Sequence, residues 1–326
     1  MNGFVRAAPS QFAMVCTSHS PLLNIDDAAP RSIVAEIREC TAAVARFVTQ
    51  FQPDLIVQFG DDHASGFNLG LMPSFCVGLR AEALGDFGTS SGPLMTDETA
   101  ARSLVESLFA DGIDVAFSYR MEVDHGIVQA QDLIVGGIRE VPSVPIIINC
   151  GGELRPPMAR VAALGRAVGA WLGKVAGRRV LLLASGGLSH DPPLPEFQRA
   201  APDVQERIIA GTRYTPALLA ARATRVHEAA IDFAGPNANA LLPLDPEWDQ
   251  WILGRVLTGD TAALASLDDE VIRDVGGRGG AEIRNWLAVL AAMDACAGGY
   301  RAELDYYRAV PELICGYAIV HGRAPL

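Results

Sequence analysis

The chain has few basic residues, and this scarcity argues against several classes of partner. Its 326 residues carry 26 Lys and Arg against 38 Asp and Glu, which gives a formal net charge of −12. Nucleic acids and anionic membranes are held by clustered lysine and arginine, so this balance disfavours both as partners. An anionic small molecule remains acceptable, because one local arginine outweighs the overall field at short range.

Cysteine is also sparse, and its pattern excludes two kinds of structural site. The six cysteines are widely spaced and form no Cys-x-x-Cys pair. Such spacing matches neither a disulfide framework nor a zinc ribbon, and it is typical of reduced thiols in the cytosol. They are Cys16, Cys40, Cys76, Cys150, Cys296 and Cys315.

Long apolar runs are missing as well. No stretch reaches the ~18 residues that are needed to span a bilayer. The first apolar segment, FAMVC at 12–16, is too short for the core of a secretion signal and runs directly into a polar turn. We therefore expect a soluble, cytoplasmic protein.

Short apolar runs and amphipathic segments alternate up to residue 185. Strands are predicted at 11–17, 54–60, 113–119, 144–149 and 179–185, and helices at 31–51, 97–110, 129–138 and 158–176. The glycine- and proline-rich stretch from Leu71 to Pro93 is expected to be a long loop with room for one strand. This alternation predicts an α/β fold with a mainly parallel or mixed central sheet and helices on both faces.

The pattern changes near Pro195. Helical segments dominate from about 195 to 300, and one late strand is predicted at 313–320, at the edge of the sheet. The glycine run GGRGG at 276–280 predicts a tight turn where the backbone passes close to another group. We expect residues 1–326 to form a single catalytic domain with a helical C-terminal portion that contributes to the same site.

Histidine is the most informative residue type in this chain. Four of the six histidines stand just past the end of an apolar run, in a short polar or glycine-rich turn. In α/β proteins ligands bind at the carboxyl ends of strands, so four imidazoles at that edge indicate metal binding or proton transfer. They are His19, His63, His125 and His190, whereas His227 and His321 lie elsewhere.

Two histidines and one carboxylate are the typical ligands of a non-haem Fe(II) centre that activates oxygen. His19 and His63 fit this pattern, because both lie early, on strands that a single crossover helix should make neighbours. Spacing does not choose the carboxylate. The candidates are Asp61, Asp62, Asp124, Asp191 and Glu282.

The residues alone leave the roles of these carboxylates open. Asp62 and Asp124 each directly precede a histidine and could orient an imidazole N–H, although an Asp-His pair is also a common turn. Glu282 stands at the start of the apolar helix EIRNWLAVLAAM. An acid there is favoured by the helix dipole, and from the residues alone this structural role is the preferred interpretation.

Longer motifs around these residues resemble the class III extradiol ring-cleaving dioxygenases almost from end to end. The resemblance is carried by SHSPLL at 18–23, DDHASGF at 61–67, MPSFCVG at 72–78, GDFG at 85–88, VDHG at 123–126, LLLASGGLSHDPP at 181–193, PLDPEWD at 243–249 and AEIRNWLA at 281–288. It implies an enzyme of aromatic catabolism that uses Fe(II) and O2 to open a catechol ring beside its two hydroxyls.

The resemblance also implies roles for individual residues. His19, His63 and Glu282 would be the iron ligands, and His125 and His190 would be acid/base residues. We expect His190 to deprotonate the catechol and His125 to act as the acid, with the reverse order left open. All five residue types are present at these positions.

Two departures from the family pattern stand out. About ten extra residues precede the first strand, and the second motif reads GDDH at 60–63 where a proline is expected in its middle. The latter leaves the ligand in place but bears on substrate preference. The glycines of ASGGLSH either allow the backbone to approach a bound ligand or form a plain turn.

The resemblance further implies 3-(2,3-dihydroxyphenyl)propionate or 2,3-dihydroxycinnamate as the substrate, which would give a muconic semialdehyde-type product. Its carboxylate needs a cation near the pocket mouth, for which Arg120 is a candidate. Alternatives are a dioxygenase for protocatechuate or catechol, a zinc hydrolase built on the same histidines, and a metal-binding relative without enzymatic activity. The resemblance also implies a homo-oligomer.

Overall fold

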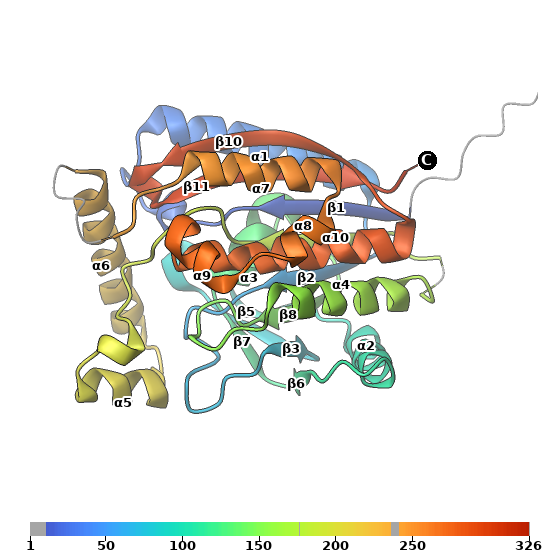
Figure 1. The fold of residues 1–326 in the computed structure, drawn as a ribbon, viewed down its shortest axis with the longest axis horizontal. Coiled ribbons are helices and arrows are strands. Elements are labelled where there is room, and N and C mark those ends of the chain that lie inside the picture. Colours follow the sequence, from blue (N-terminus) through green and yellow to red (C-terminus); the bar gives the residue numbers. More distant parts are fainter. Residues whose placement is uncertain (1–10, 176, 236–240, 326) are drawn as a thin grey trace, which may run out of the picture.

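Strands and helices alternate through the first half of the chain and build a mixed sheet, as Figure 1 shows for this computed structural model. The structure describes residues 11–175, 177–235 and 241–325. The extra residues before the first strand (1–10) and Ala176, expected at the end of a helix, lie outside the described residues.

The larger sheet has the strand order β10-β11-β1-β9-β2-β8-β3-β6. Its strands are β1 (Phe12–Thr17), β2 (Leu55–Gly60), β3 (Phe75–Gly78), β6 (Ala116–Ser118), β8 (Ser143–Ile148), β9 (Val180–Ser185), β10 (Arg301–Val310) and β11 (Cys315–Arg323). Strands β1, β9, β2 and β8 pair in parallel, whereas β11 is antiparallel to β1 and β3 is antiparallel to β8. The predicted α/β fold with a mixed sheet is confirmed.

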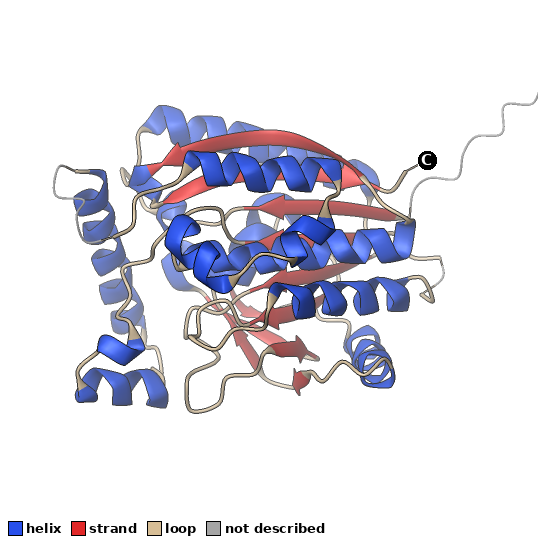
Figure 2. Ribbon diagram, viewed as in Figure 1, coloured by secondary structure: helices blue, strands red, loops and turns tan. Residues whose placement is uncertain are grey.

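Helices cover both faces of this sheet, and the central strands are therefore apolar on both sides (Figure 2). Every position of β1 and β9 is buried, as expected for parallel strands between two helical layers. Met14 packs into the core on one face, and its neighbour Val15 packs into the core on the other. One face is covered by α2 (Glu98–Ala110), α4 (Met158–Leu172), α7 (Pro246–Thr258) and α10 (Ile283–Ala297), and the other by α1 (Arg31–Phe51).

The helix expected at 129–138 begins earlier in the structure. It starts as α3 (His125–Ala130) and continues as a π-helix over Gln131–Val135. The side chain of Asp124 accepts a hydrogen bond from the N–H of Gly126 and so caps the start of α3. His125 is therefore the first residue of a helix and not part of the preceding turn.

The chain between residues 71 and 123 is more regular than expected. It contributes β3 and a smaller sheet formed by β4 (Ala81–Leu84), β5 (Ser91–Pro93) and β7 (Met121–Val123). The strand predicted at 113–119 is confined to β6. Strands of three or four residues are too short for a periodic pattern to stand out in the sequence.

The C-terminal portion is helical up to residue 297, as predicted, and then adds two strands where one was expected. Before α10 come α5 (Pro202–Ala210), α6 (Pro216–Ala234), α7, α8 (Thr261–Ala265) and α9 (Asp269–Val271). The predicted late strand is β11, but β10 precedes it and forms the edge of the sheet. The sequence of β10, RAELDYYRAV, is polar and partly exposed, which is usual for an edge strand. Among the helices of the described segments, none is long and apolar enough to cross a membrane.

Helices α4 and α10 meet along a seam of small residues. A Cβ atom at Gly165 would lie 2.4 Å from the carbonyl oxygen of Ala288, and one at Gly169 would lie 2.4 Å from that of Ala292. The two backbones approach so closely that only glycine fits. This seam matters for the site because α10 begins directly after Glu282, so the position of α10 sets the position of that carboxylate.

We predict that Gly165→Val lowers the free energy of unfolding by about 1–3 kcal/mol, because the added side chain overpacks the seam. Gly254→Ala on α7 is the matched control, since nothing lies within 4 Å of the added methyl group. The control should stabilise the helix by up to about 1 kcal/mol. Urea unfolding of both variants measures the two effects, and equal stability of Gly165→Val and wild type would contradict the prediction.

Candidate metal centre and active site

The structure brings the four strand-end histidines together. The rings of His19 and His63 lie 5.1 Å apart between centroids, and the ring of His125 stacks on that of His63 at 4.3 Å. His190 joins through Glu282, whose Oε1 lies 3.2 Å from His190 Nε2. His321 instead lies on β11, where its Nδ1 is 2.7 Å from a carboxylate oxygen of Asp305.

The prediction that the strands before His19 and His63 are neighbours was wrong. Strands β1 and β2, which precede these histidines, are separated by β9, which pairs with both. The three strands end at the same edge, so His19, His63 and His190 still converge. His125 arrives differently, from β7 of the smaller sheet and the start of α3.

Two imidazoles and one carboxylate point their donor atoms at one another. His19 Nε2 and His63 Nε2 are 3.3 Å apart, and the two oxygens of Glu282 lie 3.7 Å and 3.6 Å from them. The outer ring nitrogens are held from behind, because His19 Nδ1 is 2.9 Å from Ser185 Oγ and His63 Nδ1 is 3.2 Å from Asp124 Oδ1. Metal-binding histidines are typically oriented in this way.

A second carboxyl group lies inside the same cluster. Asp61 Oδ2 is 3.2 Å from His63 Nε2. One ligand atom each from His19, Asp61, His63 and Glu282 lies within 4.8 Å of the others. His19 and His63 also form such a group with His125, so the two imidazoles are common to both possible metal positions.

Glu282 stands at the start of α10, as the sequence predicts, and its carboxylate is also a member of the cluster. The residue is only 4% exposed and its Oε2 accepts a hydrogen bond of 2.8 Å from the N–H of Gly187. A Cβ atom at Gly186 would lie 2.7 Å from that same oxygen. The two glycines of ASGGLSH therefore allow close approach of Glu282 to the strand end.

Burial and charge set the ionisation of His19 and Glu282. Burial lowers the pKa of His19 to about 3, so its imidazole is neutral. Burial opposes the charged form of Glu282, but the charge and hydrogen bond of His190 outweigh it and hold the pKa of that carboxyl well below its usual value. A neutral imidazole and an ionised carboxylate are the forms that bind a metal.

The negative charges gathered in the cluster shift the pKa values of both Asp61 and His63. Burial, followed by the charge of Glu282, raises the pKa of Asp61 well above its usual value. Burial alone would lower the pKa of His63, but Asp61 and Asp124 outweigh it and raise that pKa well above the usual value. A divalent cation supplies the positive charge that these carboxyl groups otherwise draw from protons, so the donor set fits a metal.

The glycine run GGRGG packs against His190, as a turn that passes close to another group. The N–H of Gly279 donates to the carbonyl of His190, and a Cβ atom at Gly279 would lie 1.9 Å from His190 Nε2. On the other side, His190 Nδ1 lies 3.1 Å from the carbonyl oxygen of Leu188. These contacts leave Nε2 as the ring nitrogen that faces Glu282.

The remaining carboxylate candidates hold the surrounding loops. Asp62 accepts hydrogen bonds from the backbone N–H groups of Ser65, Gly66 and Phe67, so it stabilises the loop after β2 and does not orient an imidazole. Asp191 Oδ1 forms an ion pair of 2.6 Å with Arg278. Asp124 does contact an imidazole nitrogen, at 3.2 Å from His63 Nδ1 and at a longer 4.0 Å from Nδ1 of its neighbour His125.

Sequence reasoning missed Asp249, although it ends the motif PLDPEWD. Its carboxylate is fully buried and accepts hydrogen bonds from the N–H and the hydroxyl of Ser189 and from the hydroxyl of Tyr307. Asp249 thus holds the residue directly before His190. Burial raises its pKa to about 6.

A cavity of about 920 Å³ opens above the cluster. Asp61, His63 and Glu282 line it together with apolar side chains that include Leu69, Met72, Leu194, Phe197 and Ile208 and with the arginines Arg155, Arg199, Arg273 and Arg278. Arg120, the candidate for a substrate carboxylate, is exposed in the turn before β7 and is not among the lining residues. The structure therefore gives no support to Arg120 as the partner of a substrate carboxylate.

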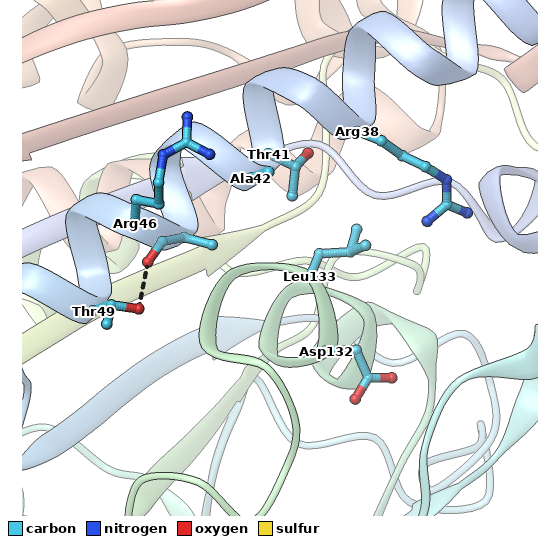
Figure 3. A pocket seen from close by; sticks show the side chains of 8 residues that line it. Arg38, Thr41, Ala42, Arg46, Thr49, Asp132 and Leu133 are labelled. Atoms are coloured by element: carbon cyan, nitrogen blue, oxygen red, sulfur yellow. Dashed lines mark hydrogen bonds between the residues drawn. The ribbon is translucent and has the colours of Figure 1, made fainter.

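A second, more open pocket of about 430 Å³ lies beside α1 (Figure 3). Its lining residues are Arg38, Thr41, Ala42, Ala45, Arg46, Thr49, Asp132 and Leu133. In Figure 3 the guanidinium groups of Arg38 and Arg46 stand apart and do not converge on one point. The larger cavity is therefore the candidate active site, and the imidazole and carboxylate groups at and below its lining are the donor types of a metalloenzyme.

Comparisons with known proteins agree with this class. A family model described as the catalytic LigB subunit of aromatic ring-opening dioxygenase matches residues 13–318. A 2,3-dihydroxyphenylpropionate/2,3-dihydroxicinnamic acid 1,2-dioxygenase from Rhodococcus jostii (strain RHA1) is 44% identical over 306 residues, which cover 94% of this chain and 96% of the relative. A protein of the same name from Mycolicibacterium gilvum (strain PYR-GCK) is 42% identical and covers 96% and 98%.

Among solved structures, an uncharacterized protein, JW3007, from Escherichia coli K12 has a TM-score of 0.55 at 16% identity, with 95% of this chain and 98% of that chain covered. This likeness supports the fold alone. The chain belongs to the family of catalytic LigB subunits of aromatic ring-opening dioxygenases, and it is an extradiol catechol dioxygenase. The family implies a metal cofactor, for which the cluster offers donors.

We predict that Asp249 makes stability depend on pH. Its pKa is raised from 3.8 to about 6, so the folded protein binds more protons than the unfolded chain in that range. The free energy of unfolding of the wild type, relative to Asp249→Asn, should fall by roughly 2–3 kcal/mol as the pH rises through this range, and level off above it. Urea unfolding of both metal-free proteins across this range measures the difference. A difference that stays constant or grows with pH would contradict the assignment.

Proposed function

We propose that this protein is an Fe(II)-dependent extradiol dioxygenase for 3-(2,3-dihydroxyphenyl)propionate or 2,3-dihydroxycinnamate. The observation that carries the proposal is the convergence of the donor atoms of His19, His63 and Glu282, beside a cavity that His63 and Glu282 line. Two further histidines contact this group, His190 through Glu282 and His125 through the ring of His63. We also propose that the whole chain acts as one catalytic domain, in which the helical C-terminal portion supplies Glu282, and that it forms a homo-oligomer.

His19, His63 and Glu282 are the proposed iron ligands. Their donor atoms lie within 3.7 Å of one another, and Ser185 and Asp124 hold the two imidazoles from behind. Fe(II) held by these two imidazoles and one carboxylate would supply the redox chemistry that ring opening by O2 requires. Glu282 is preferred to Asp61, because it reaches both imidazoles and it accepts the N–H of Gly187 as an anion.

His190 and His125 are the proposed acid/base residues. Each has one ring nitrogen held by the protein, at the carbonyl of Leu188 for His190 and at the carboxylate of Asp86 for His125. The other ring nitrogen, Nε2, is the proposed site of proton exchange with the substrate, and in His190 it lies 3.2 Å from Glu282 Oε1. We assign His190 to the removal of a catechol proton and His125 to the protonation of the departing oxygen, because proton transfer near neutral pH suits imidazole.

The cavity supports a substrate with an anionic side chain. Its volume of about 920 Å³ is within the range of small-molecule sites, and its wall carries four arginines beyond the metal cluster. Arg155 and Arg278 are paired with Asp269 and Asp191, whereas Arg199 and Arg273 are more exposed and pair only with Glu196 and Asp274 nearby in sequence. Arg199 and Arg273 are therefore the better partners for a substrate carboxylate. The relatives named for dihydroxyphenylpropionate point to the same substrate class.

We predict that Glu282→Gln and His19→Ala abolish iron binding, because each removes one of three protein ligands. His190→Ala and His125→Ala should instead retain iron and lose turnover by about 10²–10⁴-fold, the usual contribution of an acid/base residue. Iron is measured by metal analysis after anaerobic loading with Fe(II) and desalting. Full iron occupancy in Glu282→Gln would refute the ligand assignment, and Asp61→Asn, which should keep its iron, is the matched control.

We predict stoichiometric O2 uptake and a yellow ring-opened product when the Fe(II)-loaded enzyme meets 3-(2,3-dihydroxyphenyl)propionate. An oxygen electrode and visible absorbance record both. Activity confined to protocatechuate or catechol would change the substrate and keep the chemistry. Turnover that persists without O2 would favour a zinc hydrolase, and iron binding without activity on any catechol would favour a non-enzymatic relative.

A further inference from the structure

The loop Gly85-Asp86-Phe87-Gly88 wraps around the ring of His125. Gly85, Phe87 and Gly88 have φ angles of 75°, 48° and 72°, all in the left-handed region, and this tight course turns the side chain of Asp86 inward. Asp86 is 1% exposed, and the ring of Phe87 meets the ring of His125 edge-on at 4.9 Å. The loop therefore encloses a histidine that lies far away in the sequence.

The carboxylate of Asp86 contacts His125 at two nitrogens, one in the backbone and one in the ring. Its Oδ1 accepts the backbone N–H of His125 at 2.9 Å, and its Oδ2 lies 2.6 Å from the ring Nδ1. A carboxylate accepts and does not donate, so this contact places a proton on Nδ1 and leaves Nε2 as the nitrogen that exchanges protons. The His63 ring, stacked at 4.3 Å, prevents the His125 ring from rotating away.

Helix α6 supplies the positive charge beside this buried carboxylate. Arg222 NH1 lies 3.6 Å from Asp86 Oδ2, and its guanidinium stands over the rings of Phe87 and Tyr214, at 5.3 Å from each. The same guanidinium donates to the carbonyl of His63 and the hydroxyl of Ser65. Arg222 thus braces the carboxylate and the loop that carries His63.

We propose that Asp86 is the positioning residue of His125, with Arg222 as its brace. Asp86 fixes the tautomer of the imidazole and aims Nε2 at the substrate, whichever direction the proton moves there. This inference rests on the proposed function, because it assigns a partner to one of the two acid/base histidines. Asp86 touches neither the proposed ligands nor the substrate cavity lining, so its effect is expected in turnover and not in binding.

The test is Asp86→Asn in the Fe(II)-loaded enzyme. An amide is nearly the same size but can turn its NH2 toward Nδ1, which favours the tautomer with the proton on Nε2. We expect kcat to fall by about 10²–10⁴-fold, as for the loss of an acid/base group, with unchanged KM and iron content. A kcat within about twofold of wild type in the iron-loaded variant would overturn the proposal.

Asp132→Asn is the matched control. Asp132 accepts hydrogen bonds from the N–H and the hydroxyl of Ser90 and so holds the same loop from its other end. Within the described residues, no hydrogen bond or ion pair joins it to His125. If the loop matters only as structure, both variants should lose stability and activity alike. If Asp86 positions the imidazole, Asp132→Asn should keep its kcat once folded.

A measurement on the wild-type protein covers the case in which Asp86→Asn does not fold. In enzyme loaded with diamagnetic Zn(II), ¹⁵N spectra of the histidine rings, assigned with His125→Gln, report which nitrogen carries the proton. A proton on Nδ1 of His125 supports the proposal, and a proton on Nε2 alone overturns it. This readout needs no turnover, so it separates failure of the positioning role from failure of the proposed function.

Discussion

The carboxylate of Glu282 is the contact on which the rest of the site depends. It stands between the imidazoles of His19, His63 and His190 and accepts the N–H of Gly187. Four parts of the chain must meet for this to happen: the end of β1, the end of β2, the glycine turn after β9, and the start of α10. The close packing of α4 against α10 fixes the start of α10, so packing in the core also sets the position of Glu282 in the site.

Both proposed acid/base histidines are supported by a buried carboxylate, but by different routes. Asp86 contacts the ring of His125 directly, whereas Asp249 holds Ser189, the neighbour of His190 in sequence. The direct contact specifies a tautomer, and the indirect one specifies only where the residue sits. For His190 the ring is oriented instead by the carbonyl of Leu188 and by the glycine backbone at 279. The Nδ1 of His125 therefore faces a carboxylate, whereas the Nδ1 of His190 faces a carbonyl oxygen. This difference suits opposite directions of proton transfer.

The sequence predicted the fold class and the convergence of the histidines, because both follow from apolar runs and from where those runs end. It did not predict that β9 separates β1 from β2, since strand order depends on the crossovers and not on local pattern. The edge strand β10 was not predicted, because its residues are mostly polar and form no apolar run. Asp86 and Asp249 could not be assigned either, because their partners lie 39 and 60 residues away, and no local pattern encodes such contacts.

The charge of the chain connects these observations. A net charge of −12 repels an anionic substrate at long range, and the cluster itself buries Asp61, Asp124 and Glu282 close together. The positive side chains lie close to the negative groups that they balance, with Arg222 beside Asp86 and four arginines on the cavity wall, and the donor cluster fits a divalent cation. Because Coulomb interactions strengthen at short range and low dielectric, these few local charges outweigh the overall field inside the cavity. An acidic protein can in this way still accept an anionic small molecule, because arginines lie on the wall of the cavity that the molecule would enter.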